Sequence, residues 1–310
     1  MMSTMPKINL VFHVGALGDW VLTFPIMRAL RGPTVVVTSW SKAKLAEELF
    51  DHVRAMDIEL REFTRLHAPG GPAALGPAVG EALSQADALI SFISNGSDAW
   101  AQNVRRLAPQ AKHIFLPPRP PDDRDLHVTD WHAEQLASQG LPLETQAIAI
   151  QNHAQGLVVI HPGSGGEAKC WPADRFECLI QALEQTGQAV RVLLGEVELE
   201  TWPAAIQKSW AKSFPVEEIR DLDALRLILT QASFYIGNDS GPTHLAAQMG
   251  VPTVALFGPT RANQWAPIGP AVHVLAPSHP QPMTWLGLDR VLAACTELGR
   301  MIGRDDLNVV

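Results

Sequence analysis

Short apolar runs alternate with helix-length segments along the whole chain, and this alternation limits the fold more than any other feature. A strand that is followed by a helix and then by another strand re-enters its sheet in the same direction. The pattern therefore predicts parallel sheets that are covered by helices on both faces. The predicted strands are residues 7–14, 34–39, 87–93, 113–116, 157–161, 189–194, 233–237 and 253–257. The predicted helices are residues 20–31, 42–50, 99–107, 175–186, 222–230 and 243–249.

The alternation occurs twice, with a polar stretch near residues 145–155 between the two runs. The chain has 310 residues, which suits two domains of about 150 residues better than one. Its apolar content of 46% allows each half to bury a core. We expect an α/β protein with two Rossmann-like domains, residues 1–150 and 151–310, whose parallel sheets face a central cleft. The proline-rich segment 117–126 is predicted to be an exposed loop.

Composition excludes several classes of partner. The formal charge of −8 argues against nucleic acid as a main partner. There is no apolar run of about 18 residues, so we expect no membrane span, and the N-terminal sequence lacks the long apolar region of a signal peptide. Three cysteines suit a reducing compartment without a disulfide framework. We therefore expect a cytoplasmic protein.

The first loop with suitable chemistry for a ligand is HVGALGDWVLTFPIMRALR, residues 13–31. Ligands of parallel sheets bind where strands lead into helices, and Gly15 and Gly18 allow a tight turn there. The G-x-G-x-x-G fingerprint of a dinucleotide site is absent, and the second strand ends without an acidic residue, which disfavours a nicotinamide oxidoreductase. Asp19 stands near the helix start, either as its N-cap or as a carboxylate that faces the cleft.

The second loop lies in HPGSGGEAKCWPADRFECLIQAL, residues 161–183. Its three glycines allow backbone N–H groups to point at an anion, although the spacing is not that of a P-loop. Lys169 follows this loop and either reaches a phosphate or is a solvated lysine. Trp171 and Pro172 are expected to start the next helix.

The third loop is GNDSGPTHLAAQ, which begins at Gly237. The helix that starts there would favour a diphosphate, which the Asp239 carboxylate would repel. Asp239 therefore either contacts uncharged sugar hydroxyls or caps the helix, and His244 either donates to a phosphate or packs in the turn. Two loops for anions and one carboxylate for hydroxyls together suit a sugar nucleotide.

Four segments carry a resemblance to glycosyltransferase family 9, the ADP-heptose:lipopolysaccharide heptosyltransferases. They are LGDWVLTFPIMRALR, HPGSGGEAKCWPADRFECLIQAL, LLGEVELE and IGNDSGPTHLAAQMGVPTVALFGPT, and the last is the most specific. The resemblance covers nearly the whole chain. It implies a GT-B fold with an N-terminal acceptor-binding domain and a C-terminal donor-binding domain, and an inverting transferase that uses no metal and no cofactor.

The resemblance also implies roles for particular residues. Asp19 would be the general base on the acceptor hydroxyl, Glu198 would bind the ribose of the donor, and Asp239 would bind its sugar. The remaining donor residues would hold the diphosphate, and these are Ser164, Gly165, Lys169, Ser240, Gly241 and His244. The implied donor is ADP-heptose or a similar ADP-sugar. The implied acceptor is a lipopolysaccharide core or a related glycan, with peripheral contact at the inner membrane.

Three points remain open from the sequence. Trp20 and Phe24 stand beside Asp19 where family members have small residues, so the acceptor subsite is expected to differ. Two D-x-D strings, at 123–125 and 221–223, are interpreted as solvated or capping acids and not as metal ligands. The alternative to a transferase is a sugar-nucleotide-binding protein without catalysis, and the presence of Asp19 in the other half disfavours it.

Overall fold

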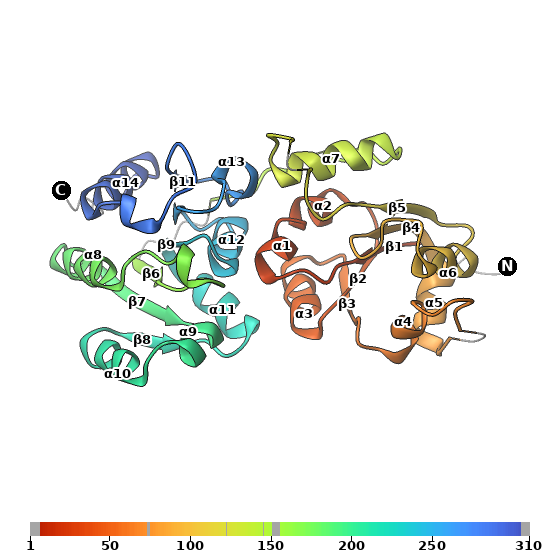
Figure 1. Ribbon diagram of the computed structural model, residues 1–310, viewed down its shortest axis with the longest axis horizontal. Coiled ribbons are helices and arrows are strands. Elements are labelled where there is room, and N and C mark those ends of the chain that lie inside the picture. The colour runs from red at the N-terminus through yellow and green to blue at the C-terminus, as the bar shows by residue number, and fades with distance from the viewer. Residues whose placement is uncertain (1–6, 73–74, 122, 145, 151–155, 305–310) are drawn as a thin grey trace. The chain divides into compact units, whose positions relative to one another are not determined.

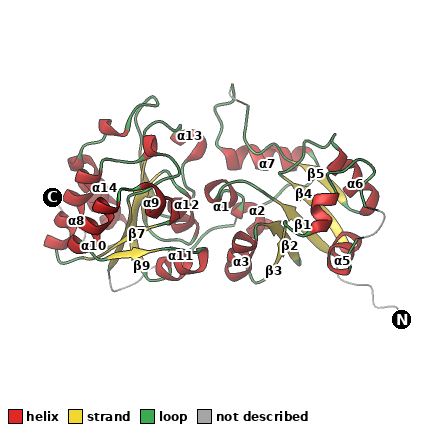
Figure 2. Ribbon diagram, turned by 60° about the horizontal axis from the view of Figure 1, so that its bottom comes forward, coloured by secondary structure: helices red, strands yellow, loops and turns green. Residues whose placement is uncertain are grey.

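The computed structural model describes residues 7–72, 75–121, 123–144, 146–150 and 156–304. The chain divides into two compact units, residues 1–146 and 147–310. Each unit holds one parallel sheet with helices on both sides (Figure 1, Figure 2). This confirms the expected α/β fold. The N-terminal stretch considered for a signal peptide includes residues 1–6, which lie outside the described residues, as do residues 145 and 151–155 of the polar stretch.

The N-terminal unit has a five-stranded sheet in the order β3-β2-β1-β4-β5. The strand order reverses at β1, where β2 lies on one side and β4 on the other. Loops that follow strands at such a point form the usual ligand site of a parallel sheet. The strands are β1 Ile8–Phe12, β2 Thr34–Thr38, β3 Val53–Asp57, β4 Ala86–Ser91 and β5 Lys112–Phe115. The helices are α1 Leu17–Val21, α2 Phe24–Ala29, α3 Trp40–Leu49, α4 Arg61–Arg65, α5 Pro77–Gln85, α6 Ala99–Leu107 and α7 Val128–Ser138.

The C-terminal unit has a six-stranded sheet in the order β11-β10-β9-β6-β7-β8, which reverses between β6 and β9. Helices α8 and α14 contact each other on one side of this sheet, and α11 and α12 lie on the other (Figure 2). The strands are β6 Leu157–His161, β7 Ala189–Leu194, β8 Val216–Glu218, β9 Ala232–Asn238, β10 Thr253–Leu256 and β11 Val272–Leu275. The helices are η1 Glu167–Lys169, α8 Ala173–Gln185, α9 Glu196–Thr201, α10 Ala204–Ser213, α11 Leu222–Leu229, α12 Gly241–Gln248, α13 Ala262–Trp265, η2 Met283–Trp285 and α14 Leu288–Met301.

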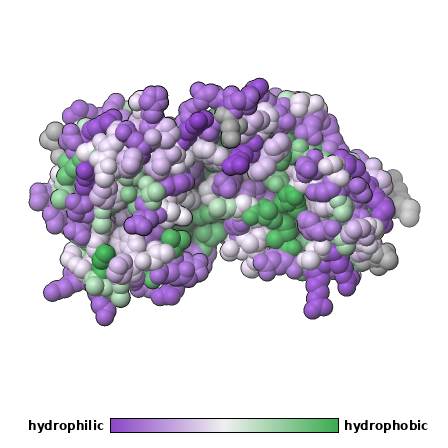
Figure 3. Space-filling view, in the orientation of Figure 1, coloured by the Kyte–Doolittle hydropathy of each residue, from purple (hydrophilic) through white to green (hydrophobic). Residues whose placement is uncertain are grey.

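Each unit has its own hydrophobic core. In the N-terminal unit the Phe12 ring packs edge-on against Trp100 and Phe63, with centroids 5.1 and 5.5 Å apart. In the C-terminal unit Trp171 and Phe176 pack in the same way at 4.9 Å. Hydrophilic side chains dominate the surface seen in Figure 3, and hydrophobic ones gather in a few patches.

The helix expected over residues 20–31 is wrong, because the structure has two short helices there, α1 and α2. Pro25 lies in the first turn of α2. A proline has no N–H to donate and its ring clashes with the carbonyl four residues earlier, so one continuous helix cannot form. The loop expected at 117–126 is confirmed for the described residues, none of which lies in a helix or a strand.

Candidate functional site

The loop after β6 is attached to the end of β9 by the buried side chain of Asn238. Its Nδ2 donates to the carbonyl oxygens of Pro162 and Gly163 at 2.7 and 3.3 Å, and its Oδ1 accepts from Trp171 N at 3.0 Å. Ser164 Oγ donates to the carbonyl oxygen of Asp239 at 2.7 Å. The glycine-rich loop and the β9–α12 loop therefore form one site where the strand order reverses.

Lys169, Asp239 and His244 form a charged cluster in this site. Lys169 Nζ donates to Asp239 Oδ2 at 2.8 Å, and His244 Nε2 lies 3.5 Å from Asp239 Oδ1. Burial opposes ionisation of Asp239, yet His244 and Lys169 outweigh it and hold the pKa of its carboxyl at about 2. Asp239 is therefore a carboxylate at neutral pH, and its charge is balanced by Lys169.

The capping interpretation of Asp239 is wrong. The N-cap of α12 is Ser240, and the helix begins at Gly241. Lys169 is likewise not a free solvated lysine, because it forms the ion pair with Asp239. His244 packs in the turn against Asp239, and its buried Nδ1 has no hydrogen-bond partner among the described residues.

The helix expected to start at Trp171 and Pro172 begins one residue after the proline, at Ala173. The backbone of Pro172 has ψ 135°, which is extended and not helical. Trp171 is buried in the core of the C-terminal unit, with 1% of its surface exposed.

Glu198 is buried where α9 starts. Its Oε2 accepts from Gly195 N at 2.8 Å and lies 3.3 Å from His161 Nε2. Burial disfavours the charged form of Glu198, but the hydrogen bonds from His161 and Gly195 outweigh it, so the pKa of this carboxyl lies below its ordinary value. These hydrogen bonds hold the carboxylate in one position. The sequence motif G-x-x-E alone does not predict them.

A cavity of about 700 Å³ lies beside this carboxylate. The glycine-rich loop forms one wall, with Ser164 and Gly165, and Glu198 contributes a carboxylate. Another wall is apolar and includes Val197, Trp202 and Ile206. A cavity with a few polar groups and an apolar wall is typical of a small-molecule site.

Cys170 also lines this cavity. Burial, together with Glu198 and Glu167, raises the pKa of its thiol to about 11. The thiol is therefore protonated at neutral pH and is not a reactive nucleophile.

We predict that Gly163→Ala removes Glu198 from its position. A Cβ at Gly163 would overlap the Glu198 carboxylate, so this side chain has to move toward the cavity beside it. Displacing it also breaks the hydrogen bond to Gly195, so we expect a loss of about 1 kcal/mol in the free energy of unfolding. Thermal unfolding and nucleoside binding measure the two effects. Gly166→Ala is the stability control, since a Cβ there meets nothing within 4 Å. Equal melting temperatures for both variants would contradict this prediction.

In the N-terminal unit, Asp19 is exposed in the first turn of α1. The N-cap of α1 is Ala16, so the interpretation of Asp19 as an N-cap is wrong. The Cβ of Asp19 packs close to Gly15, whose carbonyl oxygen accepts from Lys42 Nζ at 2.6 Å. Burial lowers the pKa of Lys42 and the nearby Asp19 carboxylate opposes that shift. A lysine thus lies near Asp19, which the sequence analysis did not identify.

Trp20 and Phe24 are fully buried in the N-terminal unit. Their rings pack edge-on with centroids 5.8 Å apart, and Phe24 also packs on Phe50 at 5.3 Å. These two side chains thus fill the interior of the unit behind Asp19. Three exposed apolar side chains follow the carboxyl ends of the neighbouring strands β1, β2 and β3, and these side chains belong to Val14, Trp40 and Leu60.

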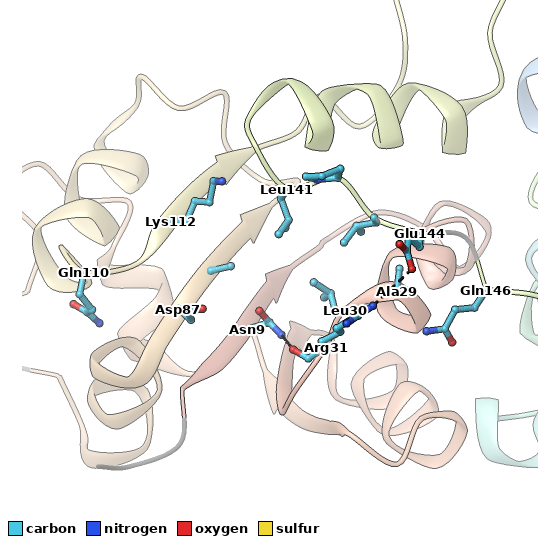
Figure 4. A pocket seen from close by; sticks show the side chains of 13 residues that line it. Asn9, Ala29, Leu30, Arg31, Asp87, Gln110, Lys112, Leu141, Glu144 and Gln146 are labelled. Carbon is cyan, nitrogen blue, oxygen red and sulfur yellow. Dashed lines mark hydrogen bonds and ion pairs between the residues drawn. The ribbon is translucent and has the colours of Figure 1, made fainter.

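A second cavity, of about 620 Å³, lies at the opposite end of the N-terminal unit's strands (Figure 4). Asn9, Asp87 and Lys112 line it near the amino ends of β1, β4 and β5, and Asn9 Nδ2 donates to Arg31 O at 3.0 Å. It contains none of the predicted site residues. Its charged side chains of both signs show no preference for one kind of ligand.

Among the residues that the structure describes, no three His, Cys, Asp or Glu side chains are grouped as a metal site. Asp221 caps α11 by accepting from Ala224 N at 2.8 Å, and Asp223 pairs with Arg226, which confirms the capping and solvated interpretation of this D-x-D string. Asp123 and Asp125 are exposed in the proline-rich loop. No described helix is long and apolar enough to cross a membrane.

Two parallel Rossmann-like sheets, with a glycine-rich loop and a charged cluster where the second sheet reverses its strand order, define a GT-B glycosyltransferase architecture. The family model described as glycosyltransferase family 9 (heptosyltransferase) matches residues 122–284, more than half of the chain. The chain belongs to this family, and the resemblance stated from the sequence is confirmed.

Relatives and solved structures agree with this assignment. Lipopolysaccharide heptosyltransferase 3 of Escherichia coli K12 is 29% identical over 54% of this chain and 51% of that protein. Lipooligosaccharide heptosyltransferase 2 of Campylobacter jejuni is 29% identical over 40% of each chain. The chain thus spans about half the length, or less, of these relatives.

The structure of E. coli heptosyltransferase WaaC with ADP has a TM-score of 0.69 at 19% identity, covering 94% of this chain and 100% of that one. A family 9 glycosyltransferase from Veillonella parvula has a TM-score of 0.68 at 19% identity, covering 94% and 97%. At this level of identity both show the shared fold.

Proposed function

We propose that this protein is an inverting, metal-independent glycosyltransferase. It moves heptose or a similar sugar from an ADP-sugar to a lipopolysaccharide core or a related glycan. The observation that carries the proposal is the cluster of Lys169, Asp239 and His244, which lies beside a glycine-rich loop and the first turn of α12. A cation, a carboxylate and a helix N-terminus at one place suit a ligand that has both a diphosphate and hydroxyl groups.

The donor would be bound by the C-terminal unit, which corresponds to the predicted domain 151–310. The nucleoside would occupy the cavity, with its base on the apolar wall and its ribose hydroxyls at Glu198. The diphosphate would lie at Ser164, Gly165 and Lys169, and at the start of α12, where Gly241 offers an N–H group without a helical acceptor. His244 would line the same place while its Nε2 stays at Asp239.

The acceptor would be bound by the N-terminal unit, which corresponds to the predicted domain 1–150. Asp19 is exposed and makes no hydrogen bond within the described residues, so its carboxylate is available to a substrate hydroxyl. Trp40 is 55% exposed at the same edge of the sheet and suits the apolar face of a sugar ring. A lipid-linked acceptor would bring the protein to the cytoplasmic face of the inner membrane as a peripheral protein.

The reaction would proceed in one displacement. The acceptor hydroxyl forms a bond to the anomeric carbon while the bond to the diphosphate oxygen breaks, which inverts the anomeric centre. The electron pair leaves with ADP, whose new charge is stabilised by Lys169 and the first turn of α12. Asp19 takes the proton of the hydroxyl.

A screen of nucleotide-sugars tests this proposal. ADP and ADP-sugars should raise the melting temperature and NAD should not, and the ADP-sugar that binds should be consumed when glycan acceptors are added. Binding without turnover on any glycan would favour the sugar-nucleotide-binding protein without catalysis. Stabilisation by NAD alone would contradict the proposal.

We expect turnover to survive chelation. Lys169 and the N-terminus of α12 meet the charge of the leaving group, so a divalent ion is not needed there. The measurement is the rate of transfer in excess EDTA, with added magnesium or manganese as the comparison. A loss of turnover that either metal restores would overturn this part of the proposal.

A further inference from the structure

His161 has no role in the sequence analysis or in the proposed function. It is the last residue of β6, and only 6% of its side chain is exposed. Its Nε2 lies 3.3 Å from Glu198 Oε2, and its Nδ1 lies 3.4 Å from Ser240 Oγ. One imidazole therefore joins the start of α9 to the start of α12.

The donors and acceptors around His161 determine which of its ring nitrogens carries the hydrogen. The Glu198 carboxylate can only accept, so Nε2 carries a hydrogen and donates it. Thr243 Oγ1 donates its own hydrogen to the carbonyl oxygen of Asn238 at 2.5 Å. The Ser240 hydroxyl, 3.1 Å from Thr243 Oγ1, therefore has two possible acceptors, Thr243 and the Nδ1 of His161.

The contacts of Glu198 show that its position depends on this histidine. The carboxylate accepts hydrogen bonds from His161 and from the backbone N–H of Gly195, and a Cβ on Gly163 would overlap it on another side. Without His161, Glu198 would lose its side-chain donor and its connection to Ser240.

We propose that His161 is the positioning residue of the donor site, where it holds Glu198 and Ser240 in register with one another. This inference rests on the proposed function, in which Glu198 binds the ribose and Ser240 lies at the diphosphate. His161 itself does not contact the donor. It couples Glu198 to Ser240, so that the nucleoside and the diphosphate of one donor can bind at the same time.

Two substitutions separate the two hydrogen bonds. In His161→Asn the side-chain amide stands close to the place of Nδ1, so it serves Ser240 and leaves Glu198 without its donor. In His161→Gln the amide reaches the place of Nε2, so it serves Glu198 and leaves Ser240 without this partner. Both variants keep a polar side chain in the buried position.

Calorimetry with adenosine and ADP measures each half of the site. We expect His161→Asn to weaken adenosine binding about tenfold, because Glu198 loses its fixed position. We expect His161→Gln to retain adenosine binding and to weaken ADP binding about tenfold. In both variants the KM for the ADP-sugar should rise while kcat changes little.

The control is His273→Asn, which changes a histidine on β11 of the same unit that lies 3.9 Å from Glu297. It should bind both ligands as the wild type does. If both His161 variants bind adenosine and ADP normally and only melt at a lower temperature, His161 has a purely structural role and the inference fails. If the wild type binds neither ligand, the proposed donor site fails first, and the positioning role fails with it.

Discussion

Asp19→Asn is expected to lower kcat by roughly 10²–10⁴-fold, the usual contribution of a general base. The carboxylate lies at the carboxyl end of β1, where the strand order of its sheet reverses, and it is exposed. Asparagine has nearly the same shape but cannot accept the proton of an acceptor hydroxyl. Steady-state rates and donor binding of the variant test this. Donor affinity should be unchanged, because every predicted donor residue belongs to the other unit.

The chain contains a matched control for this substitution. Asp130 is the third residue of α7 as Asp19 is the third residue of α1, and it is also exposed in the same unit. Both changes to asparagine remove a negative charge from a first helical turn, at a cost of about 0.3–1 kcal/mol in stability. Asp130→Asn should therefore match Asp19→Asn in melting temperature and the wild type in rate. Near-normal turnover of Asp19→Asn would show that the base is a different group.

Asp239→Asn is expected to lower kcat/KM for the ADP-sugar by roughly 10- to 150-fold. A hydrogen bond to a charged group is worth about 1.5–3 kcal/mol, and about 1.4 kcal/mol corresponds to a factor of ten. ADP should bind at least as well as to the wild type, since Lys169 loses its internal partner and becomes available to the phosphates. Kinetics with the ADP-sugar and calorimetry with ADP measure the two effects.

Asp223→Asn serves as the control for Asp239→Asn. Asp223 belongs to the same unit and forms an exposed ion pair with Arg226, so its loss should change neither quantity. Lys169→Ala removes the other member of the ion pair with Asp239. It should weaken ADP binding and leave adenosine binding intact. A normal kcat/KM for Asp239→Asn, together with a lower melting temperature, would assign Asp239 a structural role only.

The α/β fold and the loops that form the site could be predicted from the sequence. The apolar runs marked the central strands, since a strand buried on both faces consists almost entirely of apolar residues. Three edge strands, β3, β8 and β11, were not predicted, because their sequences VRAMD, VEE and VHVL are short and include charged or polar side chains. The split of α1 and α2 shows that one proline can override the helical spacing around it.

The contacts between side chains within the site could not be predicted from the sequence. Lys169 and Asp239 are 70 residues apart, and they meet because β6 pairs with β9, an adjacency that the order of elements along the chain does not specify. The N-cap interpretations of Asp19 and Asp239 were wrong because helix boundaries are hard to place. A boundary that shifts by one to three residues gives the N-cap position to another residue. His161 was missed because an ordinary strand-end histidine gives no signal of its partners.

The ion pair between Lys169 and Asp239 lets the site discriminate between ligands. Any ligand that takes Lys169 leaves the buried Asp239 carboxylate with His244 alone, so a ligand that also supplies a partner for Asp239 is favoured. A nucleotide such as ADP, which lacks the transferred sugar, offers its phosphates to Lys169 and no hydroxyl to Asp239. An ADP-sugar supplies partners for both. In the proposed function this competition favours release of the spent ADP and keeps free cellular nucleotides from occupying the site.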